Sequence, residues 1–130
     1  MEIYVDGILC AIVLKKDKEF CKTQFLTPVD AEFQMGVVVR NRNEIINPHR
    51  HIKQQRLLKS TSEALFVRRG DVIVEFYDEK DKVVSSCSLE KGDAILLFGG
   101  AHGFKTNDGF ELLEIKQGPY QAGADKEALV

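Results

Sequence analysis

The sequence predicts an all-β domain, and three observations support this fold class. Short apolar runs recur at intervals of about 8–12 residues, turns rich in Gly and Asp separate these runs, and no long stretch follows the helical period of about 3.6 residues. The chain has 130 residues, which is within the size of one domain, so we expect a single domain over residues 1–130. An antiparallel barrel or sandwich is the architecture that this pattern indicates.

The first third of the chain contains two short strands joined by a tight turn. Residues 1–5 and 8–14 are apolar runs, and Asp6-Gly7 between them is a typical hairpin turn. Residues 20–26 predict a third strand. Apolar strands placed ahead of a barrel in residues 1–32 would leave open edges, and pairing with a neighbouring subunit would cover them. We therefore expect a homodimer.

The rest of the chain alternates strands and polar turns. The three consecutive valines in residues 33–40 favour a strand, whereas the polar residues 52–59 fit either a loop or a ragged strand. Further strands are predicted at residues 63–67, 72–77, 83–89, 94–98 and 110–116, with turns at 68–71, 78–81 and 91–93 and a loop at 99–100. Residues 125–129 are the one place where a short helix is expected.

Composition excludes several classes of protein. The net charge of −2 gives no basic excess of the kind that nucleic-acid binding requires. Three unevenly spaced cysteines without a CxxC pair predict reduced thiols rather than a disulfide framework or a zinc ribbon. The chain does not open with a signal-peptide pattern, and the apolar run 8–14 is far shorter than the ~20 residues that cross a bilayer. We expect a cytoplasmic protein without a membrane segment.

The histidines predict a metal site. On an extended segment His49 and His51 point to the same side, because side chains alternate with a period of two. Glu63 and His102 would complete a set of four ligands that uses all three histidines of the chain. Three imidazoles and a carboxylate suit divalent iron, manganese, nickel, zinc or copper.

The same residues resemble the two sequence motifs of the cupin family. His49-Arg50-His51, with six residues between Glu63 and Gly70, is similar to the first motif, and Gly92, Gly99 and His102 are similar to the second. The resemblance covers about residues 33–117. It implies a cupin jelly-roll barrel (a double-stranded β-helix) with extra N-terminal strands, and a metal ion held by His49, His51, Glu63 and His102.

The spacing departs from the family pattern in one informative place. Eleven residues separate His51 from Glu63, where the family has three or four. Either a loop is inserted here, or Gln55 takes the position of the glutamate. Glu63 is preferred, because its distance to Gly70 fits and because a neutral amide is a poorer ligand than a carboxylate for a divalent ion.

A narrower resemblance concerns function. Residues 99–104 and 114–120 are similar to small cupins associated with polysaccharide or nucleotide-sugar biosynthesis. This implies a metal-dependent isomerase or epimerase acting on a sugar or nucleotide-sugar. The alternatives are an iron-dependent dioxygenase of a small organic substrate and a metal-dependent protein that binds a small ligand without turnover.

Candidates for proton transfer lie on the last predicted strand. Glu114 and Lys116 share one face with Phe110 and Leu112, so they either enter an apolar pocket that would tune them or form a solvated pair. Tyr120 follows the strand and is a third catalytic candidate. For substrate binding, the sequence offers Gln55 and Arg56, since a guanidinium binds phosphate or carboxylate through its planar fork.

Overall fold

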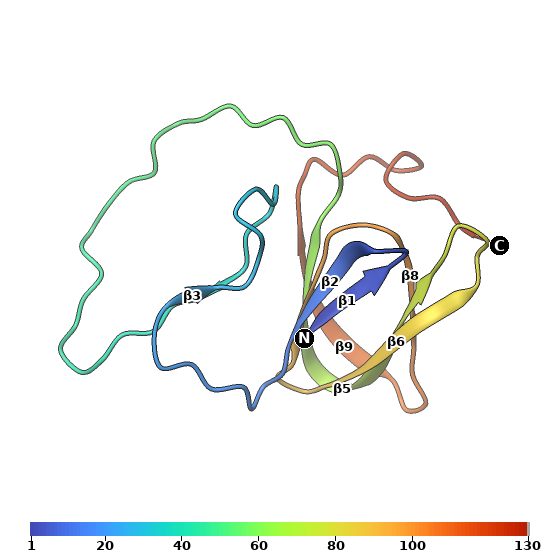
Figure 1. Cartoon of the computed structure of the whole chain (residues 1–130), viewed down its shortest axis with the longest axis horizontal. Helices are drawn as coiled ribbons and strands as arrows, with labels where there is room; N and C mark the ends of the chain where they lie inside the picture. The colour runs from blue at the N-terminus through green and yellow to red at the C-terminus, as the bar shows by residue number, and fades with distance from the viewer. Residues whose placement is uncertain (130) are drawn as a thin grey trace.

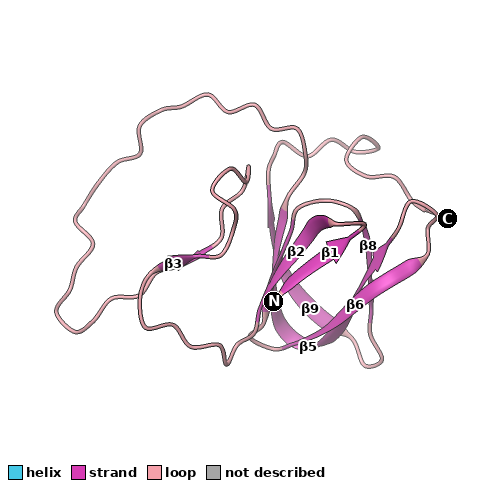
Figure 2. Ribbon diagram, viewed as in Figure 1, coloured by secondary structure: helices cyan, strands magenta, loops and turns pink. Residues whose placement is uncertain are grey.

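The computed structural model describes residues 1–129, which form nine strands and no helix (Figures 1 and 2). The strands are β1 (Glu2–Val5), β2 (Ile8–Leu14), β3 (Gln24–Phe25), β4 (Gly36–Val37), β5 (Glu63–Tyr77), β6 (Val83–Glu90), β7 (Ala94–Leu97), β8 (Ala101–Lys105) and β9 (Phe110–Lys116). Seven of them form one antiparallel sheet, and β3 and β4 form a second. The all-β fold class is confirmed, but these sheets do not close into a barrel.

The N-terminal hairpin agrees with the sequence prediction. Asp6 and Gly7 both have positive φ, 50° and 78°, as a type I′ turn between antiparallel strands requires. The far edge of β2 pairs with β7 of the same chain, with Ala11 opposite Leu97. The strand β2 is therefore enclosed by its own chain, and β1 is left as the edge strand of the sheet.

The long strand β5 organises the molecule because it changes partners along its length. Its first half pairs with β7 on one edge and β9 on the other, and its second half pairs with β6 and β8. The change occurs at Gly70, where φ is +75° and the register with β9 has just shifted between Val67 and Arg69. The predicted turn at residues 68–71 is therefore wrong: these residues form a bulge inside one continuous strand.

The two halves of β5 and their partner strands enclose the core. Its buried side chains come from β1, β2, β5, β6 and β7, and they are Ile3, Cys10, Ala11, Val13, Leu65, Val67, Val72, Val74, Phe76, Cys87, Leu89, Ile95 and Leu97. Phe110 and Leu112 of β9 are partly buried against it. The inward positions along β5 alternate with exposed ones, as a strand with one face on a core requires.

Residues 15–62 contain little regular structure. The strands expected at 20–26 and 33–40 are reduced to the two-residue pair β3 and β4. Residues 41–58, which we call the arm, form no strand, and every one of them is exposed. In Figure 1 the arm, coloured cyan to green, makes up one end of the long axis, away from β6, β8 and the C-terminus.

Both ends of the arm are held by side chains. At one end Val39 N–H donates a 3.0 Å hydrogen bond to Thr23 Oγ1. At the other end the Glu32 carboxylate accepts from the backbone N–H groups of Lys59 and Ser60, at 3.0 and 3.2 Å. The open question about residues 52–59 is thus answered in favour of a loop.

The end of the chain differs from expectation at two places. Residues 101–105 form β8, which the Gly-rich sequence did not reveal, since only pairing with β5 makes this stretch a strand. The helix expected at 125–129 is absent; turns occupy residues 122–124 instead.

Candidate functional site

Glu63 and His102 meet at the end of the seven-stranded sheet. Glu63 is the first residue of β5, and His102 lies on β8, opposite Phe76 in the second half of β5. His102 Nε2 and Glu63 Oε2 lie 3.3 Å apart, and the two side chains are only 23% and 20% exposed. The bend in β5 makes this meeting possible, because it brings the partners of both halves of the strand to one place.

The electrostatics of this pair favour an ionised carboxylate. A hydrogen bond from His102 lowers the pKa of Glu63, although partial burial acts in the opposite direction. The second ring nitrogen of His102, Nδ1, is buried and has no hydrogen-bond partner. A buried polar atom without a partner is uncommon and costly, so this imidazole is a notable feature of the described residues.

A cavity of about 490 Å³ opens beside the pair. Its lining combines ionisable and apolar side chains from β5, β8, β9 and the C-terminal segment, namely Glu63, Leu65, His102, Phe104, Phe110, Leu112, Glu114, Lys116 and Lys126. Glu114 and Lys116 therefore face the same cavity as Glu63 and His102, together with Phe110 and Leu112. The lining is mixed, with five ionisable and four apolar side chains around one space, and convergent polar groups in a concave site are a feature of small-molecule sites.

Lys116 is the most strongly paired cation of the cavity. Its Nζ lies 2.8 Å from Asp125 Oδ2 and 3.3 Å from Glu114 Oε1, and it sits 5.4 Å from the centre of the Tyr120 ring. The hydrogen bond to Asp125 raises the pKa of Lys116 well above its ordinary value, against partial burial, and Glu114 adds to the rise. Lys116 is consequently a fixed positive charge rather than a proton acceptor.

The C-terminal segment forms a second hollow over the same pair. This space of about 300 Å³ is lined by Glu63 and His102 on one side and by Asp125, Lys126, Glu127 and Leu129 on the other. Sequence reasoning missed Asp125 and Lys126, because only the tertiary fold carries the tail back to the sheet.

His49 and His51 lie elsewhere, in the exposed arm. Their ring centroids are 5.2 Å apart, and His49 Nδ1 is 2.9 Å from the Asn47 carbonyl oxygen. The two imidazoles are thus neighbours, as expected, but on an irregular segment instead of a strand. Within residues 1–129, no three side chains of His, Cys, Asp or Glu gather as a metal site. The structure therefore brings together two of the four expected ligands.

Gln55 and Arg56 are also arm residues and do not line the cavity. Both are exposed, and Arg56 Nη2 donates a 3.2 Å hydrogen bond to Gln54 Oε1. Between Gln55 and Glu63, it is Glu63 that lies beside His102. The arm has no strand partner to hold its side chains against the sheet, which is the physical reason for this separation.

The spacing of the Glu63–His102 pair fits two ligands of one ion. Two ligand atoms at about 2.1 Å from an ion lie about 3.0 Å apart at a right angle and about 3.4 Å apart at the tetrahedral angle. The observed 3.3 Å between Nε2 and Oε2 falls between these values. The chemistry of an imidazole with an ionised carboxylate fits a borderline divalent metal.

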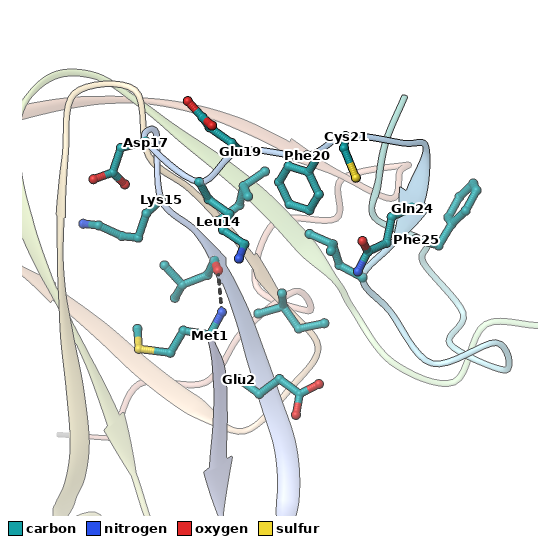
Figure 3. Close-up of a pocket in the computed structure, with 14 residues that line it drawn as sticks. Met1, Glu2, Leu14, Lys15, Asp17, Glu19, Phe20, Cys21, Gln24 and Phe25 are labelled. Atoms are coloured by element: carbon teal, nitrogen blue, oxygen red, sulfur yellow. Dashed lines mark hydrogen bonds between the residues drawn. The ribbon is translucent and has the colours of Figure 1, made fainter. Parts of the chain in front are cut away.

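A further hollow lies away from this pair, between the N-terminal hairpin and residues 17–26 (Figure 3). It measures about 670 Å³, and the Met1 amine at its floor donates a 2.9 Å hydrogen bond to the Val13 carbonyl oxygen. Phe20 and Phe25 form part of its wall, with acidic and basic side chains of similar number around them. It contains no histidine, so it offers no imidazole for metal or proton chemistry.

No family model, curated protein or solved structure matches this chain. The part of the chain that the structure describes also contains no helix with the length and apolar character needed to span a membrane.

Proposed function

We propose that this protein is a metal-dependent, cupin-like protein that binds a sugar-like small molecule in the cavity beside Glu63 and His102. Isomerisation or epimerisation is the reaction type that we favour. The observation that carries the proposal is the Glu63–His102 pair, with one buried imidazole nitrogen unpartnered, at the wall of a cavity that also contains Glu114 and Lys116. A cluster of perturbed titratable groups in a cavity is a general sign of a functional site.

Glu63 and His102 would hold the metal ion together with His49 and His51, which lie in the arm of the same chain or of a second copy. When bound, such an ion supplies Lewis-acid chemistry at a carbonyl or hydroxyl oxygen of the ligand. Glu63 suits this role because a glutamate carboxylate is charged at neutral pH, and the hydrogen bond from His102 lowers its pKa further. Gln55 and Arg56 would approach the cavity with the histidines and bind polar or anionic groups of the ligand.

Proton transfer is assigned to the residues of β9. Both isomerisation and epimerisation of a keto-sugar remove a proton from the carbon beside a carbonyl group. The Glu114 carboxylate would accept this proton, and the permanently charged Lys116 would stabilise the negative charge that develops on the oxygen. Tyr120, whose ring centre lies 5.4 Å from Lys116 Nζ, stays a catalytic candidate without an assigned step.

A metal-binding experiment tests the first half of the proposal. The affinity for Ni²⁺ and Zn²⁺ is measured by titration for the wild type and for Glu63→Gln and His102→Ala. We expect each variant to lose at least about tenfold in affinity, since a ligand of the ion is removed. Glu75→Gln is the control, because Glu75 pairs with Lys105 and Tyr77 outside the cavity. Equal affinity in all four proteins would contradict the assignment.

An activity assay tests the second half. Metal-loaded protein is incubated with a panel of keto-sugars and nucleotide-sugars in deuterated water, and exchange at carbon is followed by NMR. Glu114→Gln should lower the exchange rate by about 10²–10⁴-fold, the usual contribution of a general base. Glu111→Gln, on the other face of β9, should leave the rate unchanged. If metal-loaded wild type exchanges no proton in any member of the panel, the isomerase or epimerase function is refuted.

A further inference from the structure

The arm carries apolar side chains that nothing in its own chain covers. Its five large aliphatic residues are each at least 41% exposed, and they are Ile45, Ile46, Ile52, Leu57 and Leu58. Among the described residues, the one backbone hydrogen bond within the arm joins Glu44 N–H to the Asn41 carbonyl oxygen, so most arm amides lack a backbone partner. Exposed apolar side chains together with backbone groups that lack partners are typical of a segment that docks on another surface.

The charge of the arm is opposite to that of the remaining chain. Residues 41–58 contain four basic residues and one acidic residue, a net charge of +3 with His neutral. The other residues contain 14 basic and 19 acidic residues, a net charge of −5. We call residues 1–40 and 59–129 the body. The opposite charges of arm and body favour docking of the arm on the body of the same chain or of a second copy.

The body also offers a surface for an arm beside the cavity. Among the described strands, β8 and β9 each pair only with β5, so each has a free edge. Exposed Leu113 and Ile115 provide apolar area on the face of β9 that points away from the cavity. The carboxylates of Glu63, Glu114, Asp125 and Glu127 surround the two hollows on the cavity side. An extended basic and apolar segment can add to such an edge as a strand.

The attachment of the arm directs it away from the cavity of its own chain. Thr23 holds the first end of the arm, and Glu32 holds the second end at Lys59. Shortly after this point the chain is fixed again, because Ser62 N–H donates a 2.8 Å hydrogen bond to Gln117 Oε1. Between these points the arm extends to the opposite end of the molecule from β8 (Figure 1). In a pair of chains related by two-fold symmetry, such an arm can lie against the partner while the partner's arm lies against it.

We propose that this protein forms a homodimer in which the arm of one copy docks at the β8–β9 edge of the second copy. There the arm delivers its His49 and His51 to Glu63 and His102 of that copy. This inference rests on the proposed metal site and adds that the site is built from two chains. The occupant of the apolar surface is thus a second copy of this chain, and each dimer has two equivalent composite sites.

Mixed dimers test whether the ligands come from two chains. One parent carries His49→Ala and His51→Ala, the other carries Glu63→Gln and His102→Ala, and the two are co-expressed with different affinity tags. Ni²⁺ is the probe, and bound metal is counted in the doubly purified mixed dimer. We expect near-stoichiometric metal at one site per mixed dimer and no tight site in either parent. In a dimer whose sites are each built from one chain, the mixed dimer has no intact site.

The outcomes separate this inference from the proposed function. Wild type that binds metal while the mixed dimer binds none overturns the composite site and leaves the metal site standing. If the wild type binds no metal, the metal proposal is refuted. The docking of the arm is then tested by the molecular mass of the protein in solution. A monomeric mass by light scattering at micromolar concentration overturns the docking. If that monomer also copurifies with nucleic acid, the basic arm binds a polyanion and not a second copy of the chain.

Charge reversal on the arm gives an independent measurement. Arg50→Glu with Arg56→Glu should weaken dimerisation by about tenfold or more, measured by sedimentation, because it replaces attraction to the acidic body with repulsion. Lys80→Glu with Lys82→Glu is the control, because it makes the same charge change at the exposed tip between β5 and β6 and should leave dimerisation unchanged. Equal dissociation constants for the two double variants would contradict a role for the arm.

Discussion

At the scale of single residues, Asp93 stabilises the turn that precedes β7. Its carboxylate has no solvent exposure and accepts hydrogen bonds from the Lys15 side chain and from the backbone N–H groups of Lys16 and Glu90, the latter two both at 2.8 Å. Burial acts to raise the pKa of Asp93, but these bonds outweigh it and the pKa is lowered. One side chain therefore joins the end of β2 to the β6–β7 turn.

Replacement of Asp93 should destabilise the fold strongly. In Asp93→Asn the amide nitrogen cannot accept a hydrogen bond, and Lys15 loses its charged partner. We expect a loss of about 2–4 kcal/mol in the free energy of unfolding, measured with urea. The exposed Asp17→Asn should change this free energy by less than about 0.5 kcal/mol. A similar effect of the two substitutions would show that the buried carboxylate is not important.

The same residue predicts a pH dependence. Because the pKa of Asp93 is lowered in the folded state, its stabilising contribution is complete above the ordinary aspartate pKa of about 3.9 and is lost as the pH falls through the folded value. The difference in unfolding free energy between wild type and Asp93→Asn should therefore be constant near neutral pH and shrink below about pH 4. A difference that increases in acid would contradict this assignment.

At the scale of elements, β5 determines where the site residues lie. Gly70 allows the strand to change partners, because its φ is +75° and an added Cβ would collide with the Gly109 carbonyl oxygen. The bulge directs the first half of β5 toward β9 and the second toward β8. The cavity lies between these two neighbours, so its shape depends on this one glycine.

Two glycine substitutions separate backbone strain from steric overlap. Gly109 also has positive φ, +91°, but an added Cβ there would meet nothing within 4 Å. Gly109→Ala should thus lose about 1 kcal/mol of stability from strain alone. Gly70→Ala should lose about 3 kcal/mol or more, because strain and a backbone collision combine. Both values come from chemical denaturation, and equal losses would argue against the close approach of β5 and the β8–β9 turn.

At the scale of the whole molecule, the chain consists of a packed sheet body and an exposed arm. The core is built from strands of the body, whereas the arm contributes no buried residue. Segments with few buried contacts and few backbone hydrogen bonds open with little free energy. The stability of the body and the position of the arm are therefore separable properties.

Hydrogen exchange should reveal this division. In metal-free protein diluted below the concentration at which dimers form, the amides of residues 45–58 should exchange close to the rate of an unfolded chain, and those of residues 72–76 should exchange slowest. Addition of Ni²⁺ at higher protein concentration should slow exchange in the arm. If the arm amides are protected as strongly as β5 in the dilute, metal-free protein, the arm is not a separate segment.

The sequence was sufficient to predict features whose causes are local. The Asp6-Gly7 hairpin, the bounds of β2 and β9, and the turn at 91–93 follow from turn chemistry and period-two alternation within a few residues. Glu63 and His102 were predicted as ligands of one metal ion, which stays a prediction; the structure places His102 Nε2 and Glu63 Oε2 3.3 Å apart. The other two predicted ligands, His49 and His51, were expected side by side on an extended strand, and residues 47–51 form no strand.

Sequence alone thus determined the all-β class, most strand positions in the body and the residue types available for chemistry. Only the tertiary structure decided that residues 68–71 continue a strand, that residues 101–105 become one, and that Lys116 faces Asp125 from the tail. It also decided that the arm lies apart from the cavity. The physical reason is that a local pattern defines how a segment extends, whereas its partners depend on pairing between segments distant in the chain, and these pairings carry no local signature.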